Sequence, residues 1–213
     1  MASDPRQPSG DASHPTDCEV LAGYRQRSQQ RASRQHRLLD DVLRGRAAGV
    51  TLLLLDVDGV LTDGSLIYTE SGAEAKAFNT QDGLGLKLVR QAGVQTGLIT
   101  ARRSTIVQRR AEELALDHIY QGVDRKSAAF REILRRAGKK PAEVCYMGDD
   151  WIDLAVLSRV GLATCPANAV PEVQSACHYV ASRSGGHGAV REVCDLLVTA
   201  KGLHQSLLQS YLT

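Results

Sequence analysis

The sequence predicts an α/β fold: a doubly wound, mostly parallel β-sheet with helices on both faces and one small β-hairpin. Short apolar segments alternate with helical segments over roughly 150 residues, as in successive β-α-β units. The first of them, residues 50–57, reads as a continuous apolar strand of the kind buried on both faces of a parallel sheet. Ligands of such folds bind at the carboxyl ends of the strands, so functional residues are expected where strands end.

The chain is predicted to hold one folded domain between two tails. Its 213 residues suffice for one well-buried domain but not comfortably for two. Residues 1–35 are polar with almost no apolar periodicity, and we interpret them as a disordered tail; residues 204–213 form a second tail. The domain, residues 36–203, begins with an amphipathic helix whose apolar stripe contains Leu38, Leu39, Val42 and Leu43.

The remaining elements follow in alternation. Residues 66–68 and 75–78 flank Ser71-Gly72 and predict the β-hairpin. Asp82 is the expected N-cap of the helix at residues 82–91, and Gly138 is expected to end the helix at residues 124–137. Further strands are expected at residues 94–100, 118–120, 144–147, 162–165 and 179–181, and helices at residues 82–91, 104–114, 124–137, 150–159, 170–176 and 189–201.

Composition and charge narrow the classes of function. A net charge of +2 and 4% aromatic residues argue against binding to nucleic acid or to an anionic membrane. The longest apolar run, residues 52–55, is too short to cross a bilayer, and the N-terminus has no apolar signal-peptide core, so we expect a cytoplasmic protein. The five cysteines are far apart and lack C-x-x-C spacing, which predicts neither a disulfide framework nor a zinc site.

Two carboxylates follow the first strand. Asp56 and Asp58 are two residues apart, so in extended chain their side chains face the same way. Carboxylates held together repel each other unless a cation or a shared proton separates them. One can act as a nucleophile while the other gives a proton to the leaving oxygen and later takes one from water. The alternative is a plain turn, in which Asp58-Gly59 merely reverses the chain.

A second acidic cluster follows the strand at residues 144–147. Asp149, Asp150 and Asp153 fall within one turn at the beginning of a helix. Any one of them could cap that helix, but three exceed what a cap needs. A magnesium ion, held by one or two carboxylates and by phosphate oxygens of a substrate, explains them better.

Groups of opposite polarity follow two other strands. Thr100, Ala101 and Arg102 supply a hydroxyl, backbone amides and a guanidinium at the beginning of a helix, where a phosphate can bind. Lys126 lies in the first turn of a helix, where its charge opposes the helix dipole and needs another partner. Taken alone, Lys126 would be an ordinary surface lysine. Together with the carboxylates, these groups predict phosphoryl transfer.

The four segments resemble the motifs of the haloacid dehalogenase superfamily: DxD, then threonine, then lysine, then GDDxxD. Within it the chain resembles the 3-deoxy-D-manno-octulosonate 8-phosphate phosphatases, in residues 56–64 (DVDGVLTDG), 78–85 (FNTQDGLG), 148–153 (GDDWID) and 185–196 (GGHGAVREVCDL). The resemblance covers residues 50–202. It implies a Rossmann-like sheet and a magnesium-dependent phosphomonoesterase that hydrolyses a phosphorylated eight-carbon sugar acid of the lipopolysaccharide inner core.

The resemblance also implies roles for the acidic residues. Asp56 would be the nucleophile, forming an aspartyl-phosphate, and a ligand of Mg²⁺. Asp58 would be the general acid and base, with its backbone carbonyl on the metal. Asp149 would complete the metal ligands that the protein supplies, and Asp153 would orient Lys126.

Other residues would bind the substrate. Thr100 and Lys126 would hold the transferring phosphoryl group. Two positions depart from the family pattern. Ala101 stands where Gly is usual, and Lys87 stands where Arg is expected, so a single ammonium charge replaces a guanidinium that can donate two parallel hydrogen bonds. Arg110 is equally well explained as an exposed helix arginine. The full predicted substrate set is Asp58, Asn79, Thr80, Gln81, Asp82, Gly83, Lys87, Arg102, Arg110 and Lys126.

The segment between Leu61 and Asp82 leaves no room for a large cap domain. Capless members of the superfamily are tetramers in which neighbouring subunits cover the active site. The resemblance therefore implies a homotetramer joined partly through residues 66–78. The turn at residues 185–188 either reaches a neighbour's site or simply leads into a helix.

Three other interpretations stay open. The same chemistry could act on another acid sugar, such as a sialic or deaminated sialic acid 9-phosphate, and residues 79–87 would decide between them. The fold could instead serve as a catalytically silent binding or assembly module, although Asp56, Asp58, Lys126 and Asp149 are all present. The arginines of residues 1–35 could bind nucleic acid, which salt would weaken.

Overall fold

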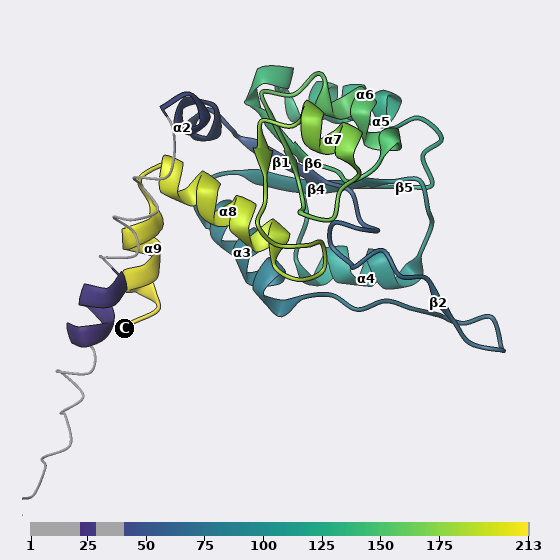
Figure 1. Ribbon diagram of the computed structural model, residues 1–213, viewed down its shortest axis with the longest axis horizontal. Coiled ribbons are helices and arrows are strands. Elements are labelled where there is room, and N and C mark those ends of the chain that lie inside the picture. The colour runs from purple at the N-terminus through teal and green to yellow at the C-terminus, as the bar shows by residue number, and fades with distance from the viewer. Residues whose placement is uncertain (1–21, 29–40, 213) are drawn as a thin grey trace, which may run out of the picture.

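The computed structural model describes residues 22–28 and 41–212 and contains the expected sheet. Six parallel strands lie in the order β5-β4-β1-β6-β7-β8 (Figure 1). The first strand is thus central, with β4 on one side and β6 on the other. The strands are β1 (Leu52–Leu55), β4 (Gln95–Thr100), β5 (His118–Gln121), β6 (Val144–Met147), β7 (Leu162–Cys165) and β8 (Tyr179–Val180).

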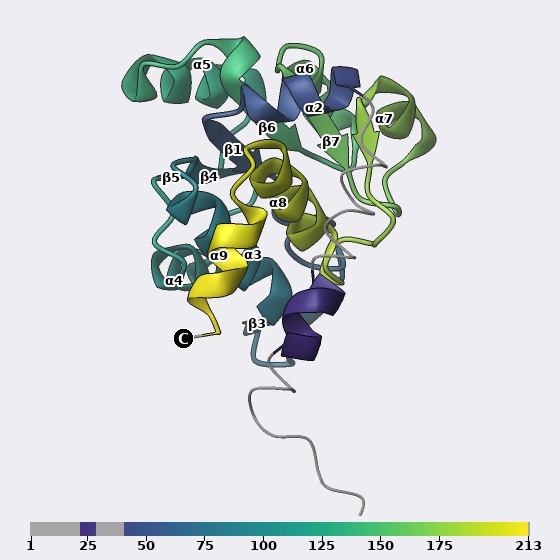
Figure 2. The same cartoon turned by 90° about the vertical axis from the view of Figure 1, so that its left-hand side faces the viewer.

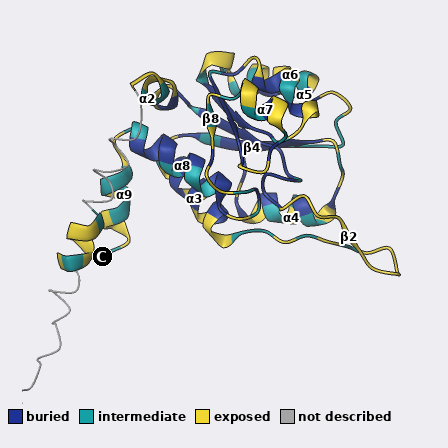
Figure 3. Ribbon diagram, viewed as in Figure 1, coloured by how far each residue is buried: buried dark blue, intermediate teal, exposed yellow. Residues whose placement is uncertain are grey.

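Helices cover both faces of the sheet, as the doubly wound prediction required (Figures 1 and 2). The alternation of β1 shows this directly, because Leu53 and Leu55 belong to one buried apolar cluster and Leu52 and Leu54 to the other. The first cluster is completed by α2 (Asp41–Ala48), α3 (Thr80–Gln91), α4 (Thr105–Glu113) and α8 (Ala189–Ala200), and the second by α5 (Lys126–Ala137), α6 (Leu154–Leu157) and α7 (Pro171–Ala176). In Figure 3 the strands of the sheet are mainly dark blue, and the helices on both faces carry buried as well as exposed residues.

Helix α3 begins earlier than expected, because Asn79 rather than Asp82 is its N-cap. The Asn79 side-chain oxygen accepts a hydrogen bond from the Gln81 N–H at 2.7 Å. Asp82 lies one turn further on and is 1% exposed. Its Oδ1 accepts from the backbone N–H of Arg191 at 2.7 Å, in the first turn of α8. Asn and Asp are both favoured N-cap residue types, so the sequence does not show which of the two caps α3. The packing of α8 on α3 decides it, because it engages Asp82.

The helix expected at residues 150–159 is broken into two short pieces. A 3-10 turn, Trp151–Asp153, precedes α6. The Asp153 carboxylate turns back and accepts from the N–H groups of Asp149 at 3.1 Å and Asp150 at 3.3 Å. Those bonds tighten the first turn and hold Asp153 inside the protein, where it is 0% exposed.

The two ends of the chain contain more helix than expected. Residues 22–28, inside the segment interpreted as a tail, are helical, whereas residues 1–21 and 29–40 lie outside the described part, including the first half of the helix expected from His36. Helix α9 (His204–Ser210) occupies the other expected tail, and its Leu207 packs against the first apolar cluster. No helix in the described part is long and apolar enough to cross a membrane.

The hairpin between β1 and α3 is present and short. Strands β2 (Ile67–Tyr68) and β3 (Glu74–Ala75) pair antiparallel and extend away from the domain (Figure 1). Leu66, Ile67 and Tyr68 are each about half exposed, at 48%, 51% and 57%. The residues between Leu61 and α3 therefore form no separate cap over the sheet edge.

The central strand should dominate stability. Leu54→Ala removes a side chain that is 0% exposed, so we expect the free energy of unfolding to fall by about 2–5 kcal/mol. Val42→Ala, at a side chain 70% exposed, should change it by less than about 0.5 kcal/mol. Urea unfolding curves measure both. Equal losses in the two variants would contradict the description of the core.

Candidate active site

The acidic segments meet because their strands are neighbours. β1 pairs with β6 in register, with Leu55 opposite Met147, so the residues that follow both strands leave the same sheet edge side by side. Asp56, Asp149 and Asp153 each offer a carboxylate oxygen, and these oxygens lie within 4.8 Å of one another. The strand ends predicted the meeting of the two acidic segments, but the side chain that was expected to face the same way as Asp56, that of Asp58, is not part of this cluster.

Lys126 is the cation at the centre of this cluster. Its Nζ lies 2.8 Å from Asp56 Oδ1 and 2.7 Å from Asp153 Oδ1, and its side chain is 3% exposed. Lys126 begins α5, whose first turn carries no acidic residue. The partner that the sequence required for a lysine at this position is therefore a pair of buried carboxylates.

Burial and repulsion set the electrostatics of the carboxylates. Burial raises the pKa of Asp56 to about 6, with Lys126 opposing the rise and Asp153 adding to it. Burial also raises the pKa of Asp149, to about 7, and repulsion from Asp56 and Asp153 adds to the effect. For Lys126, burial lowers the pKa but attraction to the two carboxylates outweighs it, so the pKa is raised and the amine stays charged.

Tyr146 is a member of the cluster that sequence reasoning missed. It lies on β6, is 0% exposed, and its hydroxyl donates to Asp153 Oδ1 at 2.6 Å. Burial raises the pKa of Tyr146 well above its usual value, so the hydroxyl remains a donor. From the sequence, a tyrosine in a buried strand is expected to be an ordinary core residue. Its contact with Asp153 depends on how the strand packs in the sheet.

The cluster has the properties of a divalent cation site. Asp149 Oδ1 is buried and accepts no hydrogen bond, although a buried carboxylate oxygen needs a partner. The chain also leaves space here: Gly59 has φ of +89°, and a Cβ on it would overlap the Asp149 carboxylate. Oxygen ligands, excess negative charge and a free lone pair together fit Mg²⁺.

The second carboxylate of the first segment points elsewhere. Asp58 pairs through Oδ1 with Lys76, a residue of the hairpin. Its other oxygen lies 3.6 Å from Arg102 Nε. Thr100 is 3% exposed at the end of β4, where its hydroxyl accepts from the Arg102 N–H at 3.3 Å. The predicted Arg102 thus lies beside Asp58, and Thr100 ends the neighbouring strand.

The predicted substrate loop lies at the beginning of α3, against the turn at residues 185–188. Asn79 Nδ2 donates to the carbonyl oxygen of Gly186 at 3.3 Å, and the Gly186 N–H donates to Val60 O at 3.0 Å. The turn therefore rests on the loop that follows Asp58 in the same chain. Thr80 and Gln81 are exposed.

The remaining predicted substrate residues are more scattered. Arg110 lies over the Phe78 ring at 5.8 Å from its centroid, and a Cβ on Gly83 would overlap the Arg110 guanidinium. Lys87 is exposed two turns into α3. Asp82 faces α8 instead of the sheet edge. The structure brings Arg110 and Gly83 together but adds no contact for Lys87.

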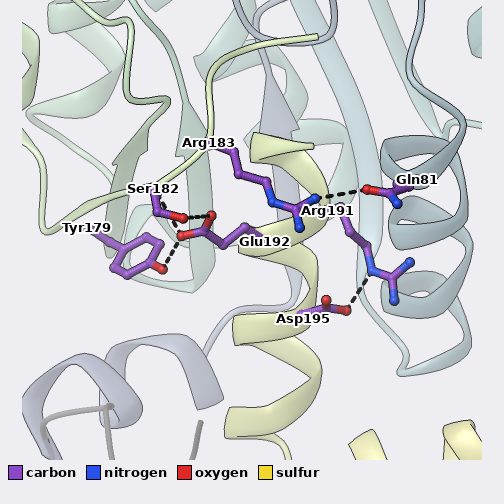
Figure 4. Close-up of a pocket in the computed structure, with 7 residues that line it drawn as sticks. All are labelled: Gln81, Tyr179, Ser182, Arg183, Arg191, Glu192 and Asp195. Carbon is purple, nitrogen blue, oxygen red and sulfur yellow. Dashed lines mark hydrogen bonds and ion pairs between the residues drawn. The ribbon is translucent and has the colours of Figure 1, made fainter. Parts of the chain in front are cut away.

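A polar cavity of about 440 Å³ opens beside this loop, between α3 and the segment that leads into α8 (Figure 4). Its charged groups have partners within the cavity: Arg183 donates to the Gln81 amide oxygen at 2.9 Å, and Arg191 pairs with Asp195 at 2.8 Å. None of the clustered carboxylates lines it. The cavity's complete lining is Gln81, Tyr179, Ser182, Arg183, Arg191, Glu192 and Asp195.

Comparison with known proteins identifies the family. Residues 110–193 match the model of haloacid dehalogenase-like hydrolases. The chain is 43% identical over 162 residues to 3-deoxy-D-manno-octulosonate 8-phosphate phosphatase of Yersinia pestis, covering 76% of this chain and 86% of the relative. The chain belongs to this phosphatase family. The enzyme of the same name from Escherichia coli K12 is 42% identical over 157 residues, which cover 74% of this chain and 84% of that one.

Solved structures of the phosphatase family share the fold. The Moraxella catarrhalis 3-deoxy-D-manno-octulosonate 8-phosphate phosphatase, crystallised with a magnesium ion, a phosphate ion and a molecule of the sugar acid, has a TM-score of 0.78 and 37% identity. The match covers 79% of this chain and 97% of that chain. The phosphatase of Yersinia pestis gives a TM-score of 0.76 at 41% identity, covering 78% and 89%.

Replacing Asp149 should separate metal binding from folding. Asp149→Asn removes one of three repelling carboxylates, so the metal-free variant should melt no lower than the metal-free wild type at a pH above the raised pKa of Asp149. Magnesium at a hundred times its Kd should stabilise only the wild type, by about 2.7 kcal/mol. Thermal melts with EDTA and with Mg²⁺ measure both effects. Asp195→Asn, outside the cluster, should retain the magnesium response; an Asp149→Asn variant that also retains it would refute the site.

Proposed function

We propose that this protein hydrolyses 3-deoxy-D-manno-octulosonate 8-phosphate to the free sugar acid and phosphate. The observation that carries the proposal is the cluster at the sheet edge, where a buried carboxylate, Asp56, is held by a buried lysine next to a site for Mg²⁺. Family membership at 43% identity supports the substrate. The enzyme is a magnesium-dependent phosphatase.

Asp56, Asp149 and the backbone carbonyl of Asp58 are the proposed magnesium ligands. When bound, the ion supplies positive charge that offsets the charge of the phosphoryl oxygens and of the clustered carboxylates. Asp153 is nearby but has other partners, since its oxygens accept from Lys126, Tyr146 and two backbone amides. Those bonds fit the role proposed for Asp153, which is to orient Lys126.

The proposed reaction has two steps. In the first, Asp56 attacks phosphorus, the bond from phosphorus to the sugar oxygen breaks, and Asp58 gives that oxygen a proton. In the second, water attacks the phosphorus of the aspartyl-phosphate, Asp58 takes a proton from it, and Asp56 leaves as a free carboxylate. Lys126 and Thr100 hold the phosphoryl oxygens throughout, and Lys126 keeps Asp56 fixed.

The sugar acid is proposed to bind between the beginning of α3 and the basic residues around it. Arg102 and Arg110 offer guanidinium groups for its carboxylate, and the first turn of α3, from the N-cap Asn79 to Gly83, offers backbone and side-chain donors. Asp82 contributes by fixing that loop to α8. Lys87, further along α3, offers a longer-range positive charge.

The hairpin is the proposed contact between subunits of a homotetramer. Its apolar side chains Leu66, Ile67 and Tyr68 are exposed in the single chain, and short antiparallel strands expose backbone groups that a neighbour can pair. A neighbouring subunit would then cover the open sheet edge. The described cysteines are free thiols, which suits a reducing compartment, and we place the reaction in the cytoplasm.

The nucleophile can be tested by one substitution. Asp56→Asn keeps the size and the hydrogen-bonding ability of the side chain but removes its nucleophilic charge, so kcat should fall by more than about a thousand-fold. Phosphate release under saturating substrate measures it, and circular dichroism checks that the variant folds. Activity near that of the wild type would rule out covalent catalysis by Asp56.

The substrate can be tested with a panel of phosphates. We expect the highest kcat/KM, in the presence of Mg²⁺, for 3-deoxy-D-manno-octulosonate 8-phosphate. The cations around the binding region favour a sugar acid over hexose phosphates, and family membership favours the eight-carbon acid over sialic acid 9-phosphate. EDTA should abolish the activity and added magnesium restore it. A preference for a nine-carbon acid would show that the proposed substrate is wrong while the proposed chemistry holds. No phosphate release from any compound would overturn the proposed function.

A further inference from the structure

The hairpin delivers a buried lysine to the proton-transferring carboxylate. Lys76 follows β3 directly, and its side chain is 1% exposed. Its Nζ pairs with Asp58 Oδ1 and lies 3.3 Å from Glu74 Oε1. A lysine this deeply buried is rare unless it is paired, so its place between two carboxylates is a specific feature of the site.

Both oxygens of Asp58 are oriented by cations. Lys76 takes Oδ1 and Arg102 lies beside Oδ2, at 3.6 Å. In the first contact the Lys76 side chain is 1% exposed and the Asp58 side chain 20% exposed. Arg102 is 41% exposed, and it also donates a hydrogen bond to the Tyr68 hydroxyl at 2.5 Å. Lys76 is therefore the stronger restraint on the direction in which the Asp58 carboxylate points.

The hairpin is attached independently of this pair. Glu74 Oε2 accepts from the Ser104 hydroxyl at 2.6 Å, and Ser104 is the N-cap of α4. Arg102 adds a second link, at 3.6 Å from Glu74 Oε1. The bond from Ser104 to Glu74 fastens the hairpin to α4 without involving Lys76 or Asp58. Holding the hairpin in place therefore does not by itself account for the contact between Lys76 and Asp58.

We propose that Lys76 is a positioning residue for Asp58, holding its carboxylate at the angle from which it exchanges protons with the leaving oxygen and with water. This inference rests on the proposed function, and it extends that function by giving the hairpin a part in the reaction of its own subunit. Lys76 contacts Asp58. The phosphoryl group is bound by Lys126 in the proposed reaction, not by Lys76. Proton transfer by a misdirected carboxylate is slow, because it depends on hydrogen-bond geometry.

The two reaction steps allow a direct test. A sugar oxygen needs a proton as it leaves, whereas nitrophenolate leaves as a stable anion. Asp58 is thus needed in both steps with the sugar acid phosphate but only in the second step with 4-nitrophenyl phosphate. If Lys76 positions Asp58, Lys76→Met should release the first nitrophenol at the wild-type rate and then stall, giving a burst of one per active site.

With the sugar acid phosphate, Lys76→Met should lower kcat by about 10–100-fold and leave KM within a few-fold. Lys76→Arg should restore part of kcat, and Lys76→Gln serves if the methionine variant fails to fold. Ser104→Ala is the matched control, because it removes the hydroxyl that fastens the hairpin to α4 and leaves both carboxylate partners of Lys76 in place, and it should give no burst.

Three results would separate the possibilities. Equal slowing of both substrates without a burst, or a burst in Ser104→Ala as well, would mean that Lys76 only holds the hairpin. Unchanged kcat in Lys76→Met, in a preparation whose wild type is active, would overturn the positioning role alone. A wild type that hydrolyses neither compound would overturn the proposed function itself.

Discussion

The ammonium group of Lys126, held between Asp56 and Asp153, is the contact on which the rest of the site depends. Three carboxylates within 4.8 Å of one another would repel strongly in a buried environment, and one lysine offsets only part of their charge. The remaining negative charge makes the cluster a good host for a divalent cation. Burial raises the pKa values of Asp56 and Asp149, and repulsion between the carboxylates adds to the rise. The same excess of negative charge lowers the stability of the metal-free fold and provides the site for the cation that phosphate chemistry needs.

The sheet supplies the constraint that places these groups. β1 lies between β4 and β6, so the residues that end all three strands reach one edge, and glycines allow the close approach there. A Cβ on Gly148 would overlap Asp153, just as one on Gly59 would overlap Asp149. The hairpin then adds Lys76, which pairs with Asp58 and lies next to Glu74, from the segment between β1 and α3.

The sequence predicted the sheet, its order of alternation and the meeting of Asp56, Lys126 and Asp149, because strand-end positions in a parallel sheet converge whatever the details of packing. It could not distinguish Asn79 from Asp82 as a cap, since that depends on where α8 crosses α3. It missed Tyr146, hidden in an apolar strand, and Lys76, whose partner is 18 residues away. Long-range partners of single polar residues leave no periodic signal.

The most direct test of the account is to trap the covalent intermediate on the wild-type protein. Borohydride added during turnover of 3-deoxy-D-manno-octulosonate 8-phosphate reduces an acyl phosphate to the alcohol, so the modified aspartate can be located by peptide mass spectrometry. The account predicts homoserine at position 56 and at no other aspartate, and only when substrate and Mg²⁺ are both present. Modification of Asp58 or Asp149 instead, or none during active turnover, would contradict the assignment of Asp56 as nucleophile.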